Sequence, residues 1–351
     1  MGVAAETDNV WDLGPPPSRP GPAPAADHVP SGVAVSLPPP TVLPVPEAPS
    51  GVPPAARRVF DELLNPPPRR PVAPPDVADR LREVLAPFAS TVAGVWPEST
   101  LRLSKSALVG VGRCEGLSVA SRLRGFPDRM PVPVAVGQVV HRAVQMLWTH
   151  PGHPLPEYVR AAVSGCGDDS PDFAAFWAQA SMAVQSDVLA KASARLAEFA
   201  DAFPPLRDEW APRFEQQVSA RVGALAVVGR PDVMLGRPRT GGVRTMLVCD
   251  VKSGELGEEH RFEALLYALL LTLRHGVPPW RSTVFSLASG EWTDPDFTVE
   301  DLLGVAVRVG EAAVAVAQLW AEVREPVLTP GGFCRWCPAA AACPSAERSG
   351  R

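Results

Sequence analysis

Asp232, Asp250 and Lys252 each stand at the edge of an apolar run. Asp232 follows Pro231 in the segment GRPDVML, and the run LVCDVK carries Asp250 and Lys252 at its end. Strand side chains alternate between faces, so Asp250 and Lys252 point the same way. Carboxylates beside a lysine suit metal-assisted cleavage of phosphodiesters, because the carboxylates bind Mg²⁺ or Mn²⁺ and the lysine orients the attacking water or stabilises developing charge. Taken alone, these residues also fit an ion pair at the solvated end of a strand.

The segment between the two aspartates predicts how they could meet. Residues 216–235 contain short alternating runs broken by Gly223, Gly229 and Pro231, a pattern typical of antiparallel strands and turns. Residues 241–252 predict the returning strand, after a hairpin loop in GRPRTGG. Antiparallel strands joined in this way would place both carboxylates at one end of a sheet.

Helical patterns surround these strands. Ser104 is a candidate N-cap for a helix that ends near Cys114, and Gly276 is a candidate C-cap. Residues 281–289 predict a further strand. The predicted helices cover residues 57–65, 76–88, 105–114, 136–150, 171–200, 258–276 and 299–323. This order predicts an α/β fold with a mixed central sheet flanked by helices.

Proline divides the chain into a tail and a folded part. The chain has 351 residues, and half of its 42 prolines lie among the first 80. Proline-rich sequence favours extended, solvated backbone over a packed core. We therefore expect a disordered tail over 1–55, a helical and Pro-rich lead-in over 56–95, and one folded domain over 96–346.

Net charge and hydropathy indicate which partners and which cellular compartment to expect. The net charge is −5 and the pI is about 5.8, so no overall basic field indicates nucleic acid, although a local basic groove is compatible with these sums. We see no stretch of the roughly 20 uncharged apolar residues that a membrane span needs, and no secretory signal. We expect a cytoplasmic protein with reduced thiols and no membrane contact.

The motif order resembles the PD-(D/E)XK nuclease superfamily. Pro231-Asp232 followed by Asp250-Val251-Lys252 is similar to its signature. The resemblance covers about residues 100–345. It implies a restriction-endonuclease-like core that hydrolyses phosphodiester bonds.

Further motifs are similar to the RecB-like branch of that superfamily. DVKSGE is similar to the branch's lysine motif, and VGQVVHRAV resembles the helix that carries a metal-binding histidine, which implies that role for His141. EALLYALLL is similar to a QxxxY helix, with Tyr267 at the tyrosine position. Glu263 stands where glutamine is usual, and a carboxylate there could bind metal or solvent but would repel a phosphate.

Three of the six cysteines form a C-x2-C-x5-C motif near the C-terminus. Clustered thiols in a reducing compartment favour a metal, and the spacing leaves zinc and iron–sulfur open. The resemblance to AddB-like nucleases implies a 4Fe–4S cluster that joins the two ends of the domain as a staple. Its ligands would be Cys114, Cys334, Cys337 and Cys343. Glu115 follows Cys114 where proline is usual, Cys249 is expected to be a buried apolar residue, and Cys166 has no expected role.

The resemblance implies an exonuclease-like, metal-dependent nuclease that cuts single-stranded DNA or duplex ends in repair, recombination or defence. The implied metal ligands are His141, Asp232, Asp250 and the Val251 carbonyl, and the implied catalytic residues are Asp232, Asp250, Lys252, Glu263 and Tyr267. Candidate phosphate-binding residues are Lys105, Arg113, Arg122, Arg124, Arg142 and Arg261. A second hypothesis is an inactive nuclease fold that serves as a DNA-binding or assembly scaffold. A third is a zinc-bound α/β protein of unrelated function. We find no P-loop motif, so a helicase would be a separate partner chain.

Overall fold

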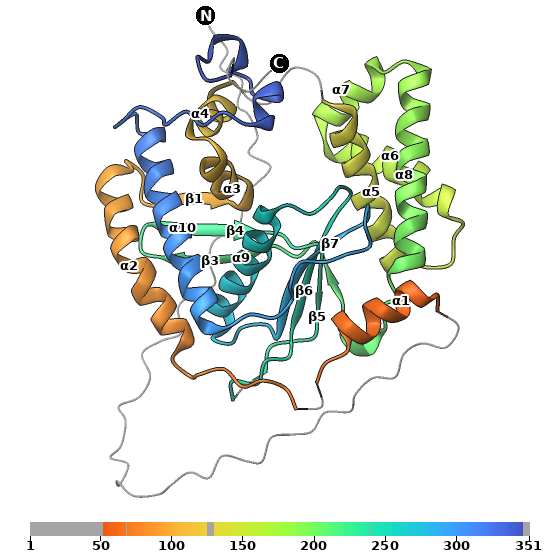
Figure 1. Ribbon diagram of the computed structural model, residues 1–351, viewed down its shortest axis with the longest axis horizontal. Helices are drawn as coiled ribbons and strands as arrows, with labels where there is room; N and C mark the ends of the chain where they lie inside the picture. The colour runs from red at the N-terminus through yellow and green to blue at the C-terminus, as the bar shows by residue number, and fades with distance from the viewer. Residues whose placement is uncertain (1–51, 68, 125–129, 240, 347–351) are drawn as a thin grey trace, which may run out of the picture. The chain divides into compact units, whose positions relative to one another are not determined.

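Two mixed β-sheets form the centre of the computed structural model, which describes residues 52–67, 69–124, 130–239 and 241–346 (Figure 1). In the first sheet, β4 (Leu225–Gly229) lies between β1 (Leu101–Ser104), which is parallel to it, and β3 (Val218–Val222), which is antiparallel. The second sheet has the order β2 (Arg213–Phe214), β5 (Val233–Leu235), β6 (Leu247–Lys252) and β7 (Arg281–Ser286), with only β6 and β7 parallel. The tail predicted over 1–55 lies outside the described residues except for its last few.

The prediction of one central sheet was therefore wrong in detail. The hydrogen-bonded ladder breaks between β4 and β5, at residues 230–232. Pro231 has no amide hydrogen to donate to a ladder, so the chain changes sheets at the position that carries Asp232.

One group of helices forms a core with the first sheet and one face of the second. It comprises α2 (Val77–Val95), α3 (Lys105–Arg113), α4 (Glu115–Arg124), α9 (Glu258–His275) and α10 (Val299–Trp320). A second group packs on the other core, which includes one face of the second sheet. It comprises α1 (Pro54–Arg58), η1 (Val59–Leu64), α5 (Val132–Thr149), α6 (Leu155–Asp169), α7 (Pro171–Gln179) and α8 (Met182–Ala202).

Strand β6 separates these two cores. Cys249 and Val251 are buried in the core that contains α5 and α8, whereas Val248 is buried in the core that contains α9. The predicted alternation is confirmed, and Asp250 and Lys252 point to the α9 side. Cys249 is fully buried, as expected for a small apolar core residue.

Several predicted elements differ from the structure. The single helix predicted over 171–200 is two helices, because the chain turns at Ala180 and Ser181 caps the start of α8. Strand β1, helix α6 and the two-residue strand β2 were not predicted. Ser104 does cap α3, and Gly276 ends α9 with a φ of 76°, both as predicted. Short 3₁₀ turns complete the described chain, at η2 (Asp208–Trp210), η3 (Gly332–Trp336) and η4 (Ala340–Ala342).

Helix α10 is long and apolar enough to cross a membrane by length and composition. Half of its most apolar window is buried inside the protein, and it packs on α2 and α9. Gly310 lies at the contact with α2, where the Phe88 ring occupies the space of a Cβ. These contacts are those of a core helix.

Candidate active site

Strands β5 and β6 bring Asp232 and Asp250 to the same end of the second sheet. Asp232 directly precedes β5, whose Val233 pairs with Cys249 of β6. The Val251 N–H donates a hydrogen bond of 2.5 Å to Asp232 Oδ2, so the backbone of β6 orients this carboxylate. The predicted hairpin therefore places the two carboxylates as expected.

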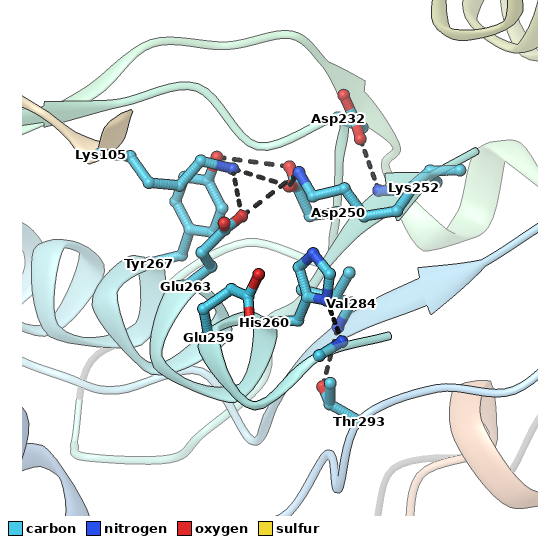
Figure 2. A network of polar contacts seen from close by, with 12 residues as sticks. Lys105, Asp232, Asp250, Lys252, Glu259, His260, Glu263, Tyr267, Val284 and Thr293 are labelled. Atoms are coloured by element: carbon cyan, nitrogen blue, oxygen red, sulfur yellow. Dashed lines mark hydrogen bonds and ion pairs between the residues drawn. The ribbon is translucent and has the colours of Figure 1, made fainter. Parts of the chain in front are cut away.

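Asp250 is almost completely buried and is held by two lysines. Its Oδ2 lies 2.6 Å from Lys252 Nζ and 2.8 Å from Lys105 Nζ, and Figure 2 shows both ammonium groups reaching this carboxylate. Burial alone would raise the pKa of Asp250, but the two lysines outweigh burial and lower it below its ordinary value. The ion pair that Asp250 and Lys252 could form at a strand end does exist, in a largely buried setting.

Glu263 and Tyr267 of α9 complete this cluster. Glu263 Oε2 lies 2.9 Å from Lys105 Nζ and 3.3 Å from Lys252 Nζ. The Tyr267 hydroxyl lies 3.3 Å from Asp250 Oδ1 and 3.1 Å from the Arg230 carbonyl. A Cβ on Gly229 would lie 2.8 Å from the Tyr267 ring, so this close approach needs glycine. The two lysine ammonium groups balance the charge of Glu263 within the protein.

A second cluster lies around Asp232. His141 Nδ1 is 3.2 Å from Asp232 Oδ1, and ligand atoms of His141, Glu215 and Asp232 all lie within 4.8 Å of one another. Among the residues that the structure describes, this is the one group with a metal-ligand arrangement of that kind. One imidazole and two carboxylates form a donor set that suits Mn²⁺ or Mg²⁺.

The local charges of this second cluster are consistent with a cation. Burial and the neighbouring Asp232 carboxylate raise the pKa of Glu215 to about 7. Burial lowers the pKa of His141, but Asp232 outweighs burial and the net shift is upward. Two adjacent carboxylates repel each other, and a bound cation would remove that repulsion.

Glu215 was missed by the sequence analysis. It lies in the segment RFEQQ, which carries no motif, and its φ of 49° is a strained backbone conformation for a residue other than glycine. Its N–H donates to the Asp232 carbonyl at 3.1 Å, and its carboxylate pairs with Arg230 at 2.9 Å. No local signal could have placed it beside His141.

Of the predicted phosphate-binding residues, Lys105 is the one whose described contacts lie in this site. Arg113 pairs with Glu259, Arg142 pairs with Asp169, and Arg261 donates to the carbonyls of Asp294 and Asp296. Arg122 lies over the rings of Trp96 and Trp320. The side chain of Arg124 lies outside the described part of the chain.

The four cysteines singled out in the sequence line one cavity of about 270 Å³. Cys114 follows α3, and Cys334, Cys337 and Cys343 come from the segment after α10. Burial and the three neighbouring thiols raise the pKa of Cys337.

The fold and site together define a nuclease-like α/β protein with carboxylates and a lysine at one strand end. A family model of the PD-(D/E)XK nuclease superfamily matches residues 102–344. The chain therefore belongs to the PD-(D/E)XK nuclease superfamily, and the superfamily expected from Asp232, Asp250 and Lys252 is confirmed. No curated protein matches the chain.

Proposed function

We propose that this protein is a deoxyribonuclease of the RecB-like branch that hydrolyses phosphodiester bonds with Mg²⁺ or Mn²⁺. The observation that supports this best is the meeting of Asp232, Asp250 and Lys252 at one end of β5 and β6, with His141 3.2 Å from Asp232. Members of the superfamily usually act as nucleases, and the site retains each charged residue that this chemistry requires.

The proposed metal ligands are His141, Asp232, Asp250 and the Val251 carbonyl, with Glu215 added from the structure. When bound, the ion would polarise the phosphate and acidify a water molecule. Asp232 is already oriented by the Val251 N–H, and the His141 ring is oriented by Asp232. The chain therefore presents much of this ligand set before any ion arrives.

Lys252 acts as a hydrogen-bond donor in this proposal. Burial would lower the pKa of Lys252, but the charge of Asp250 outweighs burial and raises it. The ammonium therefore keeps its protons at neutral pH. It can orient the attacking water and neutralise charge on the phosphate, and the water's proton leaves to solvent.

We also propose that Cys114, Cys334, Cys337 and Cys343 hold a 4Fe–4S cluster. A single zinc ion needs four ligands packed around one centre, whereas a cubane cluster bonds each thiolate to a different iron and so separates the sulfurs. The cavity of about 270 Å³ that the four thiols line has room for such a cluster between them. The cluster would join the two ends of the domain and take no part in hydrolysis.

The test is cleavage of end-labelled linear DNA, single- and double-stranded, by anaerobically purified protein with Mn²⁺ or Mg²⁺. We expect cutting that disappears with EDTA and in Lys252→Ala, and that persists in Lys191→Ala, which changes an exposed lysine on α8. Iron, sulfide and zinc are measured on the same preparation. A folded, iron-loaded protein that cuts neither substrate would overturn the proposed deoxyribonuclease activity and favour the DNA-binding scaffold. A preparation that contains zinc and no iron would overturn the proposed 4Fe–4S cluster.

A further inference from the structure

Two of the three lysines in this chain meet in the candidate active site. The sequence contains 33 lysines and arginines, of which the lysines are Lys105, Lys191 and Lys252. Lys191 lies on α8 and pairs with Asp187 one helical turn away. Arginine supplies nearly all other positive side chains, yet lysine stands at both positions that reach Asp250. A compact ammonium, rather than the broad guanidinium fork, fits this buried position.

Lys105 occupies its place because of the elements on either side of it. It is the first residue of α3 and directly follows β1, and the Ser104 cap accepts a hydrogen bond from Ala107 N. Its Nζ lies 2.8 Å from Asp250 Oδ2, 2.9 Å from Glu263 Oε2 and 5.0 Å from the centre of the Tyr267 ring (Figure 2).

Lys105 and Lys252 bind the same two carboxylate oxygens. Lys252 Nζ lies 2.6 Å from Asp250 Oδ2 and 3.3 Å from Glu263 Oε2. The side chains of Lys105 and Lys252 are 19% and 25% exposed, so both remain accessible from solvent. The two lysines are therefore near-equivalent in charge, reach and exposure.

Glu263 gives Lys105 a partner that does not depend on Asp250. A divalent ion on Asp250 would repel both ammonium groups from that carboxylate. Glu263 is not among the proposed metal ligands and lies 2.9 Å from Lys105 Nζ, so its charge stays available to that lysine. The lysine then keeps its position while one of its hydrogens is free for a new acceptor.

We propose that Lys105 is a second catalytic lysine whose ammonium contacts the phosphodiester group of the substrate, and that Glu263 is its positioning residue. This inference rests on the proposed nuclease function. It also accounts for a carboxylate where the family has glutamine, because Glu263 and Lys105 form one charge-compensated unit. The positive charge of Lys105 and the negative charge of Glu263 cancel. The net charge of the site is therefore the same as it would be with a neutral residue at position 263 and no lysine at position 105.

The test compares Lys105→Met, Glu263→Gln, the double variant and the control Lys191→Met. Binding of a fluorescein-labelled oligonucleotide is measured by anisotropy at several salt concentrations, with Ca²⁺ in place of Mn²⁺, and cleavage is measured with Mn²⁺. We expect Lys105→Met to weaken binding and to reduce the slope of log K against log salt by about 0.7–0.9, the value for one lost phosphate contact. A lysine with a purely structural role would not change that slope.

Cleavage separates the two roles. We expect kcat to fall at least about tenfold in Lys105→Met, and the double variant to be no slower than Lys105→Met because Glu263 acts through Lys105. If the fold-loss of kcat in the double variant equals the product of the two single-variant losses, the positioning role of Glu263 is overturned. An unchanged salt slope would overturn the phosphate contact. Lys105→Arg keeps the charge if Lys105→Met fails to fold, and a wild-type kcat in that variant would overturn the need for an ammonium.

The outcomes separate this inference from the proposed function. A wild-type protein that does not cut DNA overturns the nuclease and the catalytic role together. A wild type that cuts, with Lys105→Met cutting equally well, overturns the inference alone.

Discussion

Glu115→Gln should loosen the connection between the two ends of the folded domain. Glu115 begins α4, and its carboxylate accepts hydrogen bonds of 2.6 Å from each of two Arg324 nitrogens and one of 2.8 Å from the Val327 N–H. Cys114 directly precedes Glu115, and the segment after Arg324 leads to the other three cavity cysteines. This ion pair joins the two parts of the chain that line the cysteine cavity.

The contribution of this ion pair follows from its geometry and exposure. The Glu115 side chain is 17% exposed and that of Arg324 is 33% exposed. Hydrogen bonds to charged groups contribute about 1.5–3 kcal/mol when buried, and solvent screening at Arg324 reduces this, so we expect a loss of about 1–2 kcal/mol in the free energy of unfolding. For a domain of this size the melting temperature should fall by about 2–8 °C.

The same ion pair gives a pH dependence of defined sign. Hydrogen bonds from Arg324 lower the pKa of Glu115 in the folded protein, and burial opposes them only partly. The contribution is therefore fully present above the unfolded pKa of about 4.3 and is lost as pH falls through the lower folded value. The difference between wild type and Glu115→Gln should be constant from pH 6 to 8 and shrink below about pH 4.

The assay is thermal unfolding followed by circular dichroism, on preparations matched for iron content. Arg324→Gln and the double variant complete a mutant cycle, and Glu98→Gln, which changes an exposed carboxylate, is the control. Strict additivity in the cycle, or a melting temperature for Glu115→Gln equal to that of wild type, would refute the reasoning, since either result means that the two side chains do not interact.

Three further predictions concern the core, the proposed metal site and the proposed cluster. On α10, Gly310→Ala should cost about 1–3 kcal/mol because the new Cβ would overlap the Phe88 ring. Gly304→Ala on the same helix meets no atom within 4 Å and should be neutral or slightly stabilising. Equal denaturation midpoints for the two variants would contradict this. Glu215→Gln should weaken Mn²⁺ binding at least about tenfold by calorimetry, and an unchanged affinity would show that Glu215 is not a ligand. Cys334→Ser should lose iron and the brown colour, and full iron retention would exclude Cys334 from the cluster.

The parts of the fold that the sequence predicts are those with local signals. The apolar run at 247–249 identifies a buried strand, and the alternation of strand side chains then puts Asp250 and Lys252 on one face. The glycines and proline of 223–231 mark the breaks that bring Asp232 to its place. The break at Ala180 could not be predicted because alanine-rich sequence continues across it. Strand β1 is only a few residues long and forms by pairing with β4, far along the chain, so its own residues carry little signal.

Long-range pairing also explains why the site could be predicted only in part. Asp232, Asp250 and Lys252 depend on one hairpin, and their meeting could be inferred from the spacing of its strands. Lys105 joins them because β1 pairs in parallel with β4, Ser104 opposite Val228, which places the start of α3 at the same end of the sheets.

Glu263 shows the consequence for interpreting a departure from a family pattern. Judged from its own motif, a carboxylate near the proposed phosphate contact is unfavourable, because like charges repel. Its charge is balanced by Lys105, the first residue of α3, which lies in a distant part of the sequence. A substitution at a catalytic motif is therefore best judged by the total charge of the assembled site, and here Lys105 and Glu263 leave that total unchanged.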